Sequence, residues 1–284
     1  MKHRKILAAA AAVMLAVCGC GQTGEVNVEA LLEKAEQTME QVESISAEMQ
    51  MDMTMGMVGG EPVESITKTT IQTQQEPLRM QMDMTVLIDG EEEVSQMQMY
   101  ALEEAGVLKT YMYAGDTWYT ETMDMDALAQ YNAEENVDLY LDCISKAKAE
   151  GTETVSGAKT TKISGVITGE DIEEAMEVSG IAESALSLGV STDMLADMYA
   201  ELGELPLCLW IDDDGYVWKY ELDMTAIMQQ IMDFSMAAMG MAEADTGIQI
   251  GKTTVKMECL SFNDVAEIEI PAEALDGHTH IAAE

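Results

Sequence analysis

The stretch Met49-Gln50-Met51-Asp52-Met53-Thr54 occurs twice in this sequence, since Met80-Gln81-Met82-Asp83-Met84-Thr85 repeats its pattern with the same residues. A shorter echo follows at Met97-Gln98-Met99-Tyr100. Strict alternation of apolar and polar residues predicts a β-strand with one apolar and one polar face. Successive side chains of a strand point to opposite faces, so each strand carries its methionines on one side. The repeat therefore predicts a sheet with a methionine-rich face.

The same β pattern extends around the repeat, from Ile45 to about Thr122. It is interrupted by turn-forming strings such as Gly59-Gly60-Glu61-Pro62, Asp89-Gly90 and Gly115-Asp116. Consecutive strands with short connections form an antiparallel meander. A sheet of this length must twist, and we expect it to curl around what it covers.

Helical patterns flank and follow this β region. We expect a helix from Asn27 to about Glu43, a second over 125–149, and others over 170–178 and 224–241. Further strands are expected at 152–167, in a hairpin over 205–222 that turns at Asp214-Gly215, and at 248–270, whereas 277–284 should fray. The fold class is therefore α+β, and residues 28–284 are expected to form a single domain.

The N-terminus has the pattern of a secretory signal. Residues 1–5 are basic, and residues 6–17 form an apolar run too short to span a bilayer. Val17-Cys18-Gly19-Cys20 then resembles the lipobox of bacterial lipoproteins. We expect residues 1–19 to be removed, Cys20 to be lipidated and residues 20–27 to form a tether. Cys18 as the anchor, and an ordinary signal with incidental cysteines, are the alternatives.

The charge of the chain limits its partners. The 284 residues include 53 acidic and 14 basic side chains, giving a formal net charge of −39. An acidic surface repels phosphate backbones, which excludes nucleic acid as a partner. It also repels anionic lipid headgroups, so we expect membrane attachment through the lipid anchor only.

Few residues have the pattern of a catalytic or metal site. The three histidines are His3, His278 and His280, so the folded part lacks a partner for a Ser–His or Cys–His couple. The contiguous Asp212-Asp213-Asp214-Gly215 fits a hairpin turn better than a calcium loop. Cys143, Cys208 and Cys259 are expected to be buried free thiols, with one disulfide as the alternative. We expect no catalysis, no metal and no cofactor.

Several strings later in the chain carry a family resemblance. These are Lys162-Ile163-Ser164-Gly165-Val166-Ile167-Thr168-Gly169, Leu205-Pro206-Leu207-Cys208-Leu209-Trp210-Ile211-Asp212, and Ser261-Phe262-Asn263-Asp264 before Glu267-Ile268-Glu269-Ile270-Pro271. With the order of elements, they resemble the LppX/LprG-type lipoproteins and the wider LolA-like group over about Val28 to Leu275. The resemblance implies a strongly curved antiparallel β half-barrel, with helices covering its concave side around a cavity for lipid or lipid-linked molecules.

The methionine face has two interpretations. One is an ordinary core packed on helices; the other is a deformable wall of a ligand cavity, because methionine is unbranched and adaptable. A third interpretation, copper(I) binding by the thioethers, has less support because thioether ligands usually occur together with His or Cys, and this chain has few of either. The candidate cavity wall consists of Met51, Met53, Met80, Met82, Met84, Met97, Met99, Tyr111, Tyr113 and Trp118.

These observations favour a binding module over an enzyme. We expect an extracytoplasmic protein, anchored to the outer face of the bacterial cell membrane, that binds or carries a hydrophobic small molecule or lipid. The alternative is a non-catalytic cell-surface lipoprotein with a solid core, whose partner is a cell-envelope protein.

Overall fold

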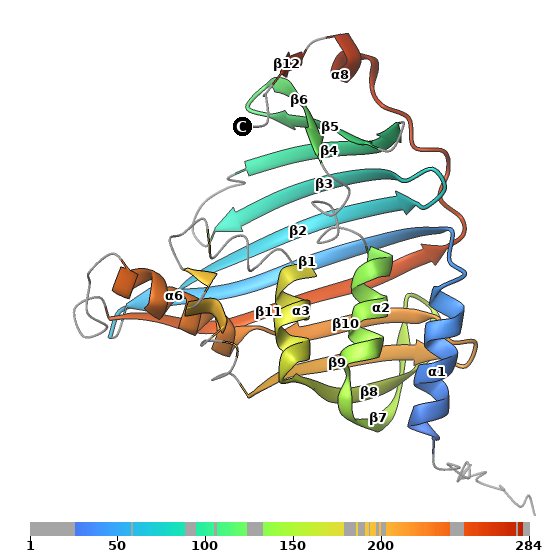
Figure 1. Ribbon diagram of the computed structural model, residues 1–284, viewed down its shortest axis with the longest axis vertical. Coiled ribbons are helices and arrows are strands. Elements are labelled where there is room, and N and C mark those ends of the chain that lie inside the picture. Colours follow the sequence, from blue (N-terminus) through green and yellow to red (C-terminus); the bar gives the residue numbers. More distant parts are fainter. Residues whose placement is uncertain are drawn as a thin grey trace, which may run out of the picture.

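The computed structural model describes residues 26–57, 59–88, 95–104, 107–123, 133–178, 203–238, 247–276 and 278–280, with isolated positions between 186 and 199. Within them, one sheet of twelve strands has the order β12-β6-β5-β4-β3-β2-β1-β11-β10-β9-β8-β7 (Figure 1). Only β12 pairs in parallel, with β6, and every other pair is antiparallel. The predicted α+β class is confirmed, and the sheet is open rather than closed.

Two meanders form this sheet. The first contains β1 (Ser44–Met57), β2 (Val63–Gln74), β3 (Arg79–Ile88), β4 (Ser95–Glu104), β5 (Val107–Ala114) and β6 (Thr117–Met123). The second contains β7 (Ser145–Val155), β8 (Ala158–Thr168), β9 (Glu204–Asp212), β10 (Val217–Asp223) and β11 (Ile248–Phe262). The pairing of β1 with β11, the two longest strands described, joins the meanders.

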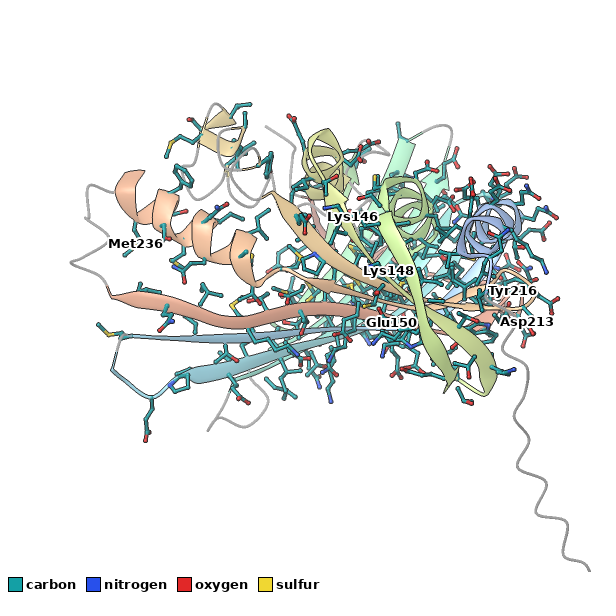
Figure 2. The ribbon with its side chains drawn as sticks, turned by 90° about the horizontal axis from the view of Figure 1, so that it is seen from below. Lys146, Lys148, Glu150, Asp213, Tyr216 and Met236 are labelled. Carbon is teal, nitrogen blue, oxygen red and sulfur yellow. The ribbon has the colours of Figure 1, made fainter. Side chains whose placement is uncertain are left out.

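The larger helices lie on one face of the sheet (Figure 2). They are α1 (Val28–Met39), α2 (Ala133–Cys143), α3 (Glu170–Val178) and α6 (Thr225–Ala238). Ala35 and Met39 of α1 share one hydrophobic core with Ile45 and Ala47 of β1. We call the face of the sheet that carries Ile45 and Ala47 the inner face, and the opposite one the outer face. The inner face is buried by helices because both elements expose an apolar side there.

The inner-face core is centred on the second meander. Leu207 and Leu209 of β9 and Tyr220 of β10 lie in the same core as the helices. The helix α3 packs on β8, α2 on β1 and β8, and α6 on β11. At the free edge, β7 carries Lys146, Lys148 and Glu150 (Figure 2). The helices thus cover mainly the half of the sheet that does not contain the methionine repeat of β3.

Three sequence-based boundaries are wrong. The expected helix over 125–149 ends at Cys143, and Ser145 onward forms β7, because pairing with β8 overrides the helical preference of Lys-Ala-Lys-Ala. The strand β11 ends at Phe262, where Asn263 takes a φ of 56°, so the region to residue 270 is not strand. Residues 278–280, expected to fray, form β12 against β6.

The signal peptide, the lipobox and most of the tether lie outside the described residues, which begin at Val26. Asn27 caps α1 as expected, since its side-chain oxygen accepts a hydrogen bond of 3.3 Å from the Ala30 amide. In the described part of the chain, no helix is long and apolar enough to cross a bilayer.

Candidate functional site

The methionine repeat forms a continuous apolar surface on the inner face of the first meander. Met49 of β1 lies opposite Thr69 of β2, which lies opposite Met84 of β3. Met84 in turn lies opposite Met97 of β4. A neighbouring row lies two residues away along each strand. Across β1 to β5 it consists of Ala47, Ile71, Met82, Met99 and Met112, each opposite the next. The pairing register therefore brings the two long repeats and the short echo onto one surface, as the alternation predicts.

Burial changes along this surface from one end of the strands to the other. At one end, Met80, Met82 and Met99 are buried with Ile71 and Leu108. Met49, Met51, Met53, Met84 and Met97 are half-buried. At the other end, Met55 is 40% exposed and Met57 is 66% exposed. The surface therefore passes from packed core to solvent within the length of one strand.

The exposed end of the methionine surface is formed by three strand ends. Met57 lies opposite Ile248 of β11, and Met55 lies opposite Val63 of β2, which is also exposed. We call these ends of β1, β2 and β11 the tip. The helix α6 lies beside it, and its residue Met236 is labelled in Figure 2. Gln229 of α6 accepts a hydrogen bond of 2.7 Å from the Ile250 amide, which fixes the helix to β11.

The predicted aromatic part of the wall lies on the other side of the sheet. Tyr111 is opposite Tyr100, and Tyr113 is opposite Trp118, with ring centroids 5.2 Å apart in the second pair. Both pairs belong to the outer face, because Met112 between the tyrosines belongs to the inner face. Tyr111, Tyr113 and Trp118 therefore do not share a wall with the predicted methionines.

The outer-face aromatic cluster is covered by the chain itself. Residues 263–271, which we call the strap, lead from β11 to α8 (Ala272–Asp276), and Figure 1 shows them running past the ends of β2 and β3. Ile268 and Ala274 pack with Tyr100 and Tyr111, and Trp118 is half-buried against them. Arg79 donates a hydrogen bond of 2.8 Å to the Ile268 carbonyl. The aromatic residues thus form a small second core.

The polar residues of the repeat face outward. In β1, the Gln50 amide donates to the Asp52 carboxylate at 2.6 Å, and in β3 the Gln81 amide donates to Asp83 at 3.2 Å. Asp52 also pairs with Lys256 of β11 at 3.0 Å. Although burial alone would raise the pKa of Asp52, the hydrogen bonds from Lys256 and Gln50 lower it. The two repeats therefore form the same local contact as well as the same strand.

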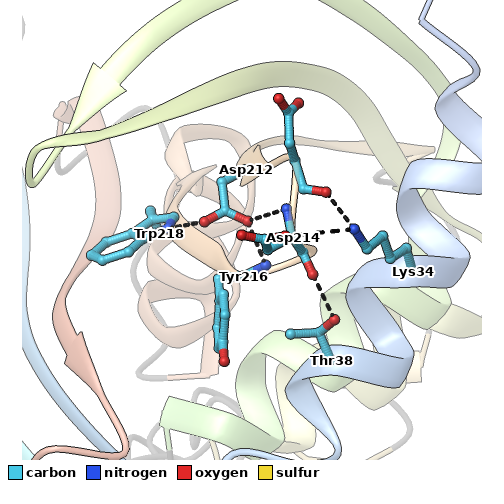
Figure 3. Close-up of polar contacts among 7 residues, drawn as sticks. Lys34, Thr38, Asp212, Asp214, Tyr216 and Trp218 are labelled. Carbon is cyan, nitrogen blue, oxygen red and sulfur yellow. Dashed lines mark hydrogen bonds and ion pairs between the residues drawn. The ribbon is translucent and has the colours of Figure 1, made fainter.

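The acidic string at 212–214 forms the expected turn. The Asp212 carboxylate accepts hydrogen bonds from the Asp214 and Tyr216 amides and, at 2.8 Å, from the Trp218 indole (Figure 3). Lys34 of α1 donates to the Asp213 carbonyl from the helix side. This string therefore builds the β9–β10 hairpin and attaches it to α1.

The three cysteines of the folded part are free thiols. Cys143 and Cys259 are buried, and burial raises their pKa to about 11 and about 12 respectively. Cys208 is half-buried. In the described part of the chain, no group of three or more His, Cys, Asp and Glu side chains is placed to hold a metal ion.

One surface recess away from the methionine surface has a volume of about 980 Å³. It lies between the C-terminal end of α1 and the strap, and it is lined mainly by polar residues that include Glu43, Gln74 and Asn263. Asn263 accepts a hydrogen bond of 2.7 Å from the Glu43 amide, so its side chain holds the chain between α1 and β1. This recess does not suit an apolar ligand, which needs a predominantly hydrophobic lining.

Sequence reasoning missed several residues of the methionine surface. Met112 and Met257 belong to it, and so does Thr69. The signal for Met112 was present, because it alternates with Tyr111 and Tyr113 and must face the other way. Met257 could not be placed from the sequence, because its position depends on which strand pairs with β1.

Comparisons with known proteins give a family model that matches part of the chain and several solved structures. The family of unknown function DUF6612 matches residues 27–158. The lipoprotein LppX of Mycobacterium tuberculosis is 14% identical, with 85% of this chain and 100% of that chain covered and a TM-score of 0.48. LprF of Mycobacterium bovis is 11% identical, with 86% and 96% covered and a TM-score of 0.46. A LolA superfamily protein of Nitrosomonas europaea is 8% identical, with 86% and 95% covered and a TM-score of 0.20.

The solved structures to which this chain is similar thus include LppX-type lipoproteins and a LolA superfamily protein, the two groups that the sequence resembles. No curated protein matches the sequence.

Proposed function

We propose that this chain is a lipid-anchored extracytoplasmic protein that binds or carries a hydrophobic, lipid-like ligand on the methionine surface of its inner face. Residues 28–284 form one domain in this proposal, after a signal peptide over 1–19 and a tether over 20–27. Binding is its activity, without catalysis. A cell-envelope protein is the partner only if the ligand hypothesis fails.

The burial gradient along the methionine surface carries the proposal. Met80, Met82 and Met99 are packed, so we assign them to the core. Met51, Met53, Met84 and Met97 are half-buried and lead toward the exposed tip, so we assign them to the ligand wall. A contiguous apolar surface that opens to solvent at one end is what a binding site for an apolar ligand needs.

Methionine suits such a wall for a physical reason. Its three rotatable bonds and polarisable sulfur let it adapt to partners of different shape, whereas a well-packed core uses it sparingly. Each ligand methylene removed from water contributes about 0.8 kcal/mol. A single long acyl chain therefore supplies enough gross stabilisation to bind after the costs of association.

The position of the ligand relative to the membrane follows from the anchor. In this proposal Cys20 carries the lipid and holds the domain at the outer face of the cell membrane. Electrostatic attraction to the membrane is not available to a chain with a net charge of −39. The anchor is thus the only membrane attachment that we propose.

A pair of matched substitutions tests the proposal. Met82→Trp enlarges a packed position and should lower the free energy of unfolding by about 1–3 kcal/mol. Met51→Trp enlarges a half-buried position, so it should change that free energy by less than about 1 kcal/mol and reduce the amount of bound ligand instead. Native mass spectrometry for co-purified lipid, together with thermal unfolding, measures both effects.

The same experiment separates the two functional hypotheses. If the wild-type protein carries no ligand and takes up no apolar probe, the ligand-binding hypothesis is rejected. The alternative, an interaction with a cell-envelope protein, then replaces it. Destabilisation of equal size in the two variants, without a difference in bound ligand, would show that the whole methionine surface is core.

A further inference from the structure

A row of hydroxyl groups crosses the methionine surface along β2. The row lies on the inner face, because each of its residues is opposite an inner-face residue of β1. It consists of Thr73, Thr69, Thr67 and Ser65. The flanking strands β1 and β3 present methionines at the same level, Met49 on one side of Thr69 and Met84 on the other. An otherwise apolar wall thus contains hydrogen-bonding groups near its centre.

Two of these hydroxyls are buried without a partner. Thr69 is 2% exposed and Thr73 is fully buried, and neither side-chain oxygen has a hydrogen-bond partner in the described part of the chain. Thr110, on the same face of β5, differs because its hydroxyl donates to the Glu121 carbonyl at 3.3 Å. An unpaired buried hydroxyl destabilises a protein, so a ligand group that hydrogen-bonds to Thr69 would gain affinity from that contact.

The surroundings of Thr69 select an uncharged group. Its described neighbours on the face, Met49, Met84, Thr67 and Ile71, carry no charge. Lys68, which is adjacent in sequence, belongs to the outer face. A carboxylate or phosphate at Thr69 would therefore be buried without a cation, in a protein whose net charge of −39 already opposes anions. A neutral ester, amide or hydroxyl meets no such penalty.

We propose that the ligand is an uncharged amphiphile of the acyl-ester class, whose carbonyl accepts a hydrogen bond from the Thr69 hydroxyl while its chain lies along Met51 and Met53 toward the tip. This inference rests on the proposed function and names the ligand class for the same site. The half-buried Met49 and Met84 beside Thr69 have the rotational freedom to move aside and expose the hydroxyl.

A competition among three matched ligands tests the inference. The full chain, purified in micelles, is incubated with equimolar methyl hexadecanoate, hexadecane and hexadecanoic acid at pH 8, and native mass spectrometry counts each adduct. The wild-type protein should favour the ester over the acid. Thr69→Val, which replaces the hydroxyl by a methyl group of the same shape, should lower the ester-to-hydrocarbon ratio about two- to tenfold relative to wild type. Comparing variants cancels differences in micelle partitioning.

Two further variants control for the hydroxyl and its location. Thr69→Ser keeps a hydroxyl and should keep the wild-type ratio. Thr254→Val removes a hydroxyl that is equally buried and unpartnered but lies on the outer face, opposite Asp52, and should also leave the ratio unchanged. The absence of adducts with all three ligands would refute the proposed function itself. Ester adducts whose ratio is the same in Thr69→Val and wild type, or a preference for the acid, would overturn this inference while ligand binding stands.

Discussion

The hydroxyl of Thr38 in α1 donates a hydrogen bond of 2.9 Å to the carbonyl oxygen of Asp214 in the β9–β10 turn (Figure 3). The contact joins two segments 176 residues apart in sequence. It requires close approach of the helix to the turn, and Gly215 permits that approach. Gly215 has a φ of +97°, and a Cβ placed there would lie 2.8 Å from the Lys34 carbonyl oxygen. The turn thus positions α1 over the second meander.

Gly215→Ala should therefore destabilise the protein by at least about 2 kcal/mol, because backbone strain adds to the clash with α1. Gly157→Ala is the matched control, since Gly157 also has a positive φ, +86°, but its Cβ would meet nothing within 4 Å. It should cost about 1 kcal/mol, the strain alone. Urea unfolding measures both variants, and equal losses would show that the approach of α1 to the turn contributes nothing.

The strap, which covers the aromatic cluster of the outer face, gives a second prediction. Arg79→Met removes the hydrogen bond to the Ile268 carbonyl and the ion pair with Glu267, at 2.8 and 3.0 Å. Amide hydrogen exchange in residues 264–271 should become faster, while exchange in β9 and β10 stays the same. Lys109→Met removes another cation from the first meander, one paired with the exposed Glu104, and should leave the strap unaffected. Unchanged exchange in Arg79→Met would mean that the packing of Ile268 and the hydrogen bonds of Gln74 to the strap hold it without Arg79.

The alternating repeat predicted the strands β1 and β3 and the sharing of one face by their methionines. The sequence could not predict which methionines are packed and which are half-buried, because Met51 and Met82 have the same local pattern. They differ in their cross-strand neighbours, which are Val255 and Thr67 for Met51 but Ile71 and Met99 for Met82. It also could not show that the strap covers Trp118, because the strap approaches from more than 140 residues away. Ser145 to Ala149 was misassigned because local helix propensity does not report an available strand partner.

The Asp52–Lys256 pair predicts a pH dependence with a definite sign. The pKa of Asp52 is lower in the folded protein than in the unfolded chain, so its contribution is fully present above the unfolded pKa near 4. That contribution is lost as the pH falls through the folded pKa. A double-mutant cycle of Asp52→Asn and Lys256→Met should give a coupling of about 0.5–1 kcal/mol at pH 7, typical of a partly exposed pair. The coupling should shrink below pH 4, and a coupling that is constant down to pH 3 would contradict the assignment.

The lipid anchor gives a prediction that depends only on the N-terminal sequence and not on the folded domain. Labelled palmitate should enter the wild-type protein in cells and be absent from Cys20→Ala. The motivation is the sequence around Gly19-Cys20, after a basic and then an apolar segment. Cys18→Ala is the control and should keep the label. Loss of label in Cys18→Ala alone would move the anchor to Cys18.

The three thiols of the folded part should differ in reactivity. Only the thiolate is nucleophilic, and burial raises the pKa of Cys143 to about 11 and that of Cys259 to about 12. At pH 8 the thiolate fraction of Cys143 is therefore about 100-fold below that of an ordinary cysteine, and that of Cys259 is lower still. Iodoacetamide labelling, resolved by peptide mass spectrometry, should modify the half-buried Cys208 first. In urea all three should react at similar rates. Rapid modification of Cys259 in the native protein would show that the core around β11 opens far more often than its packing implies.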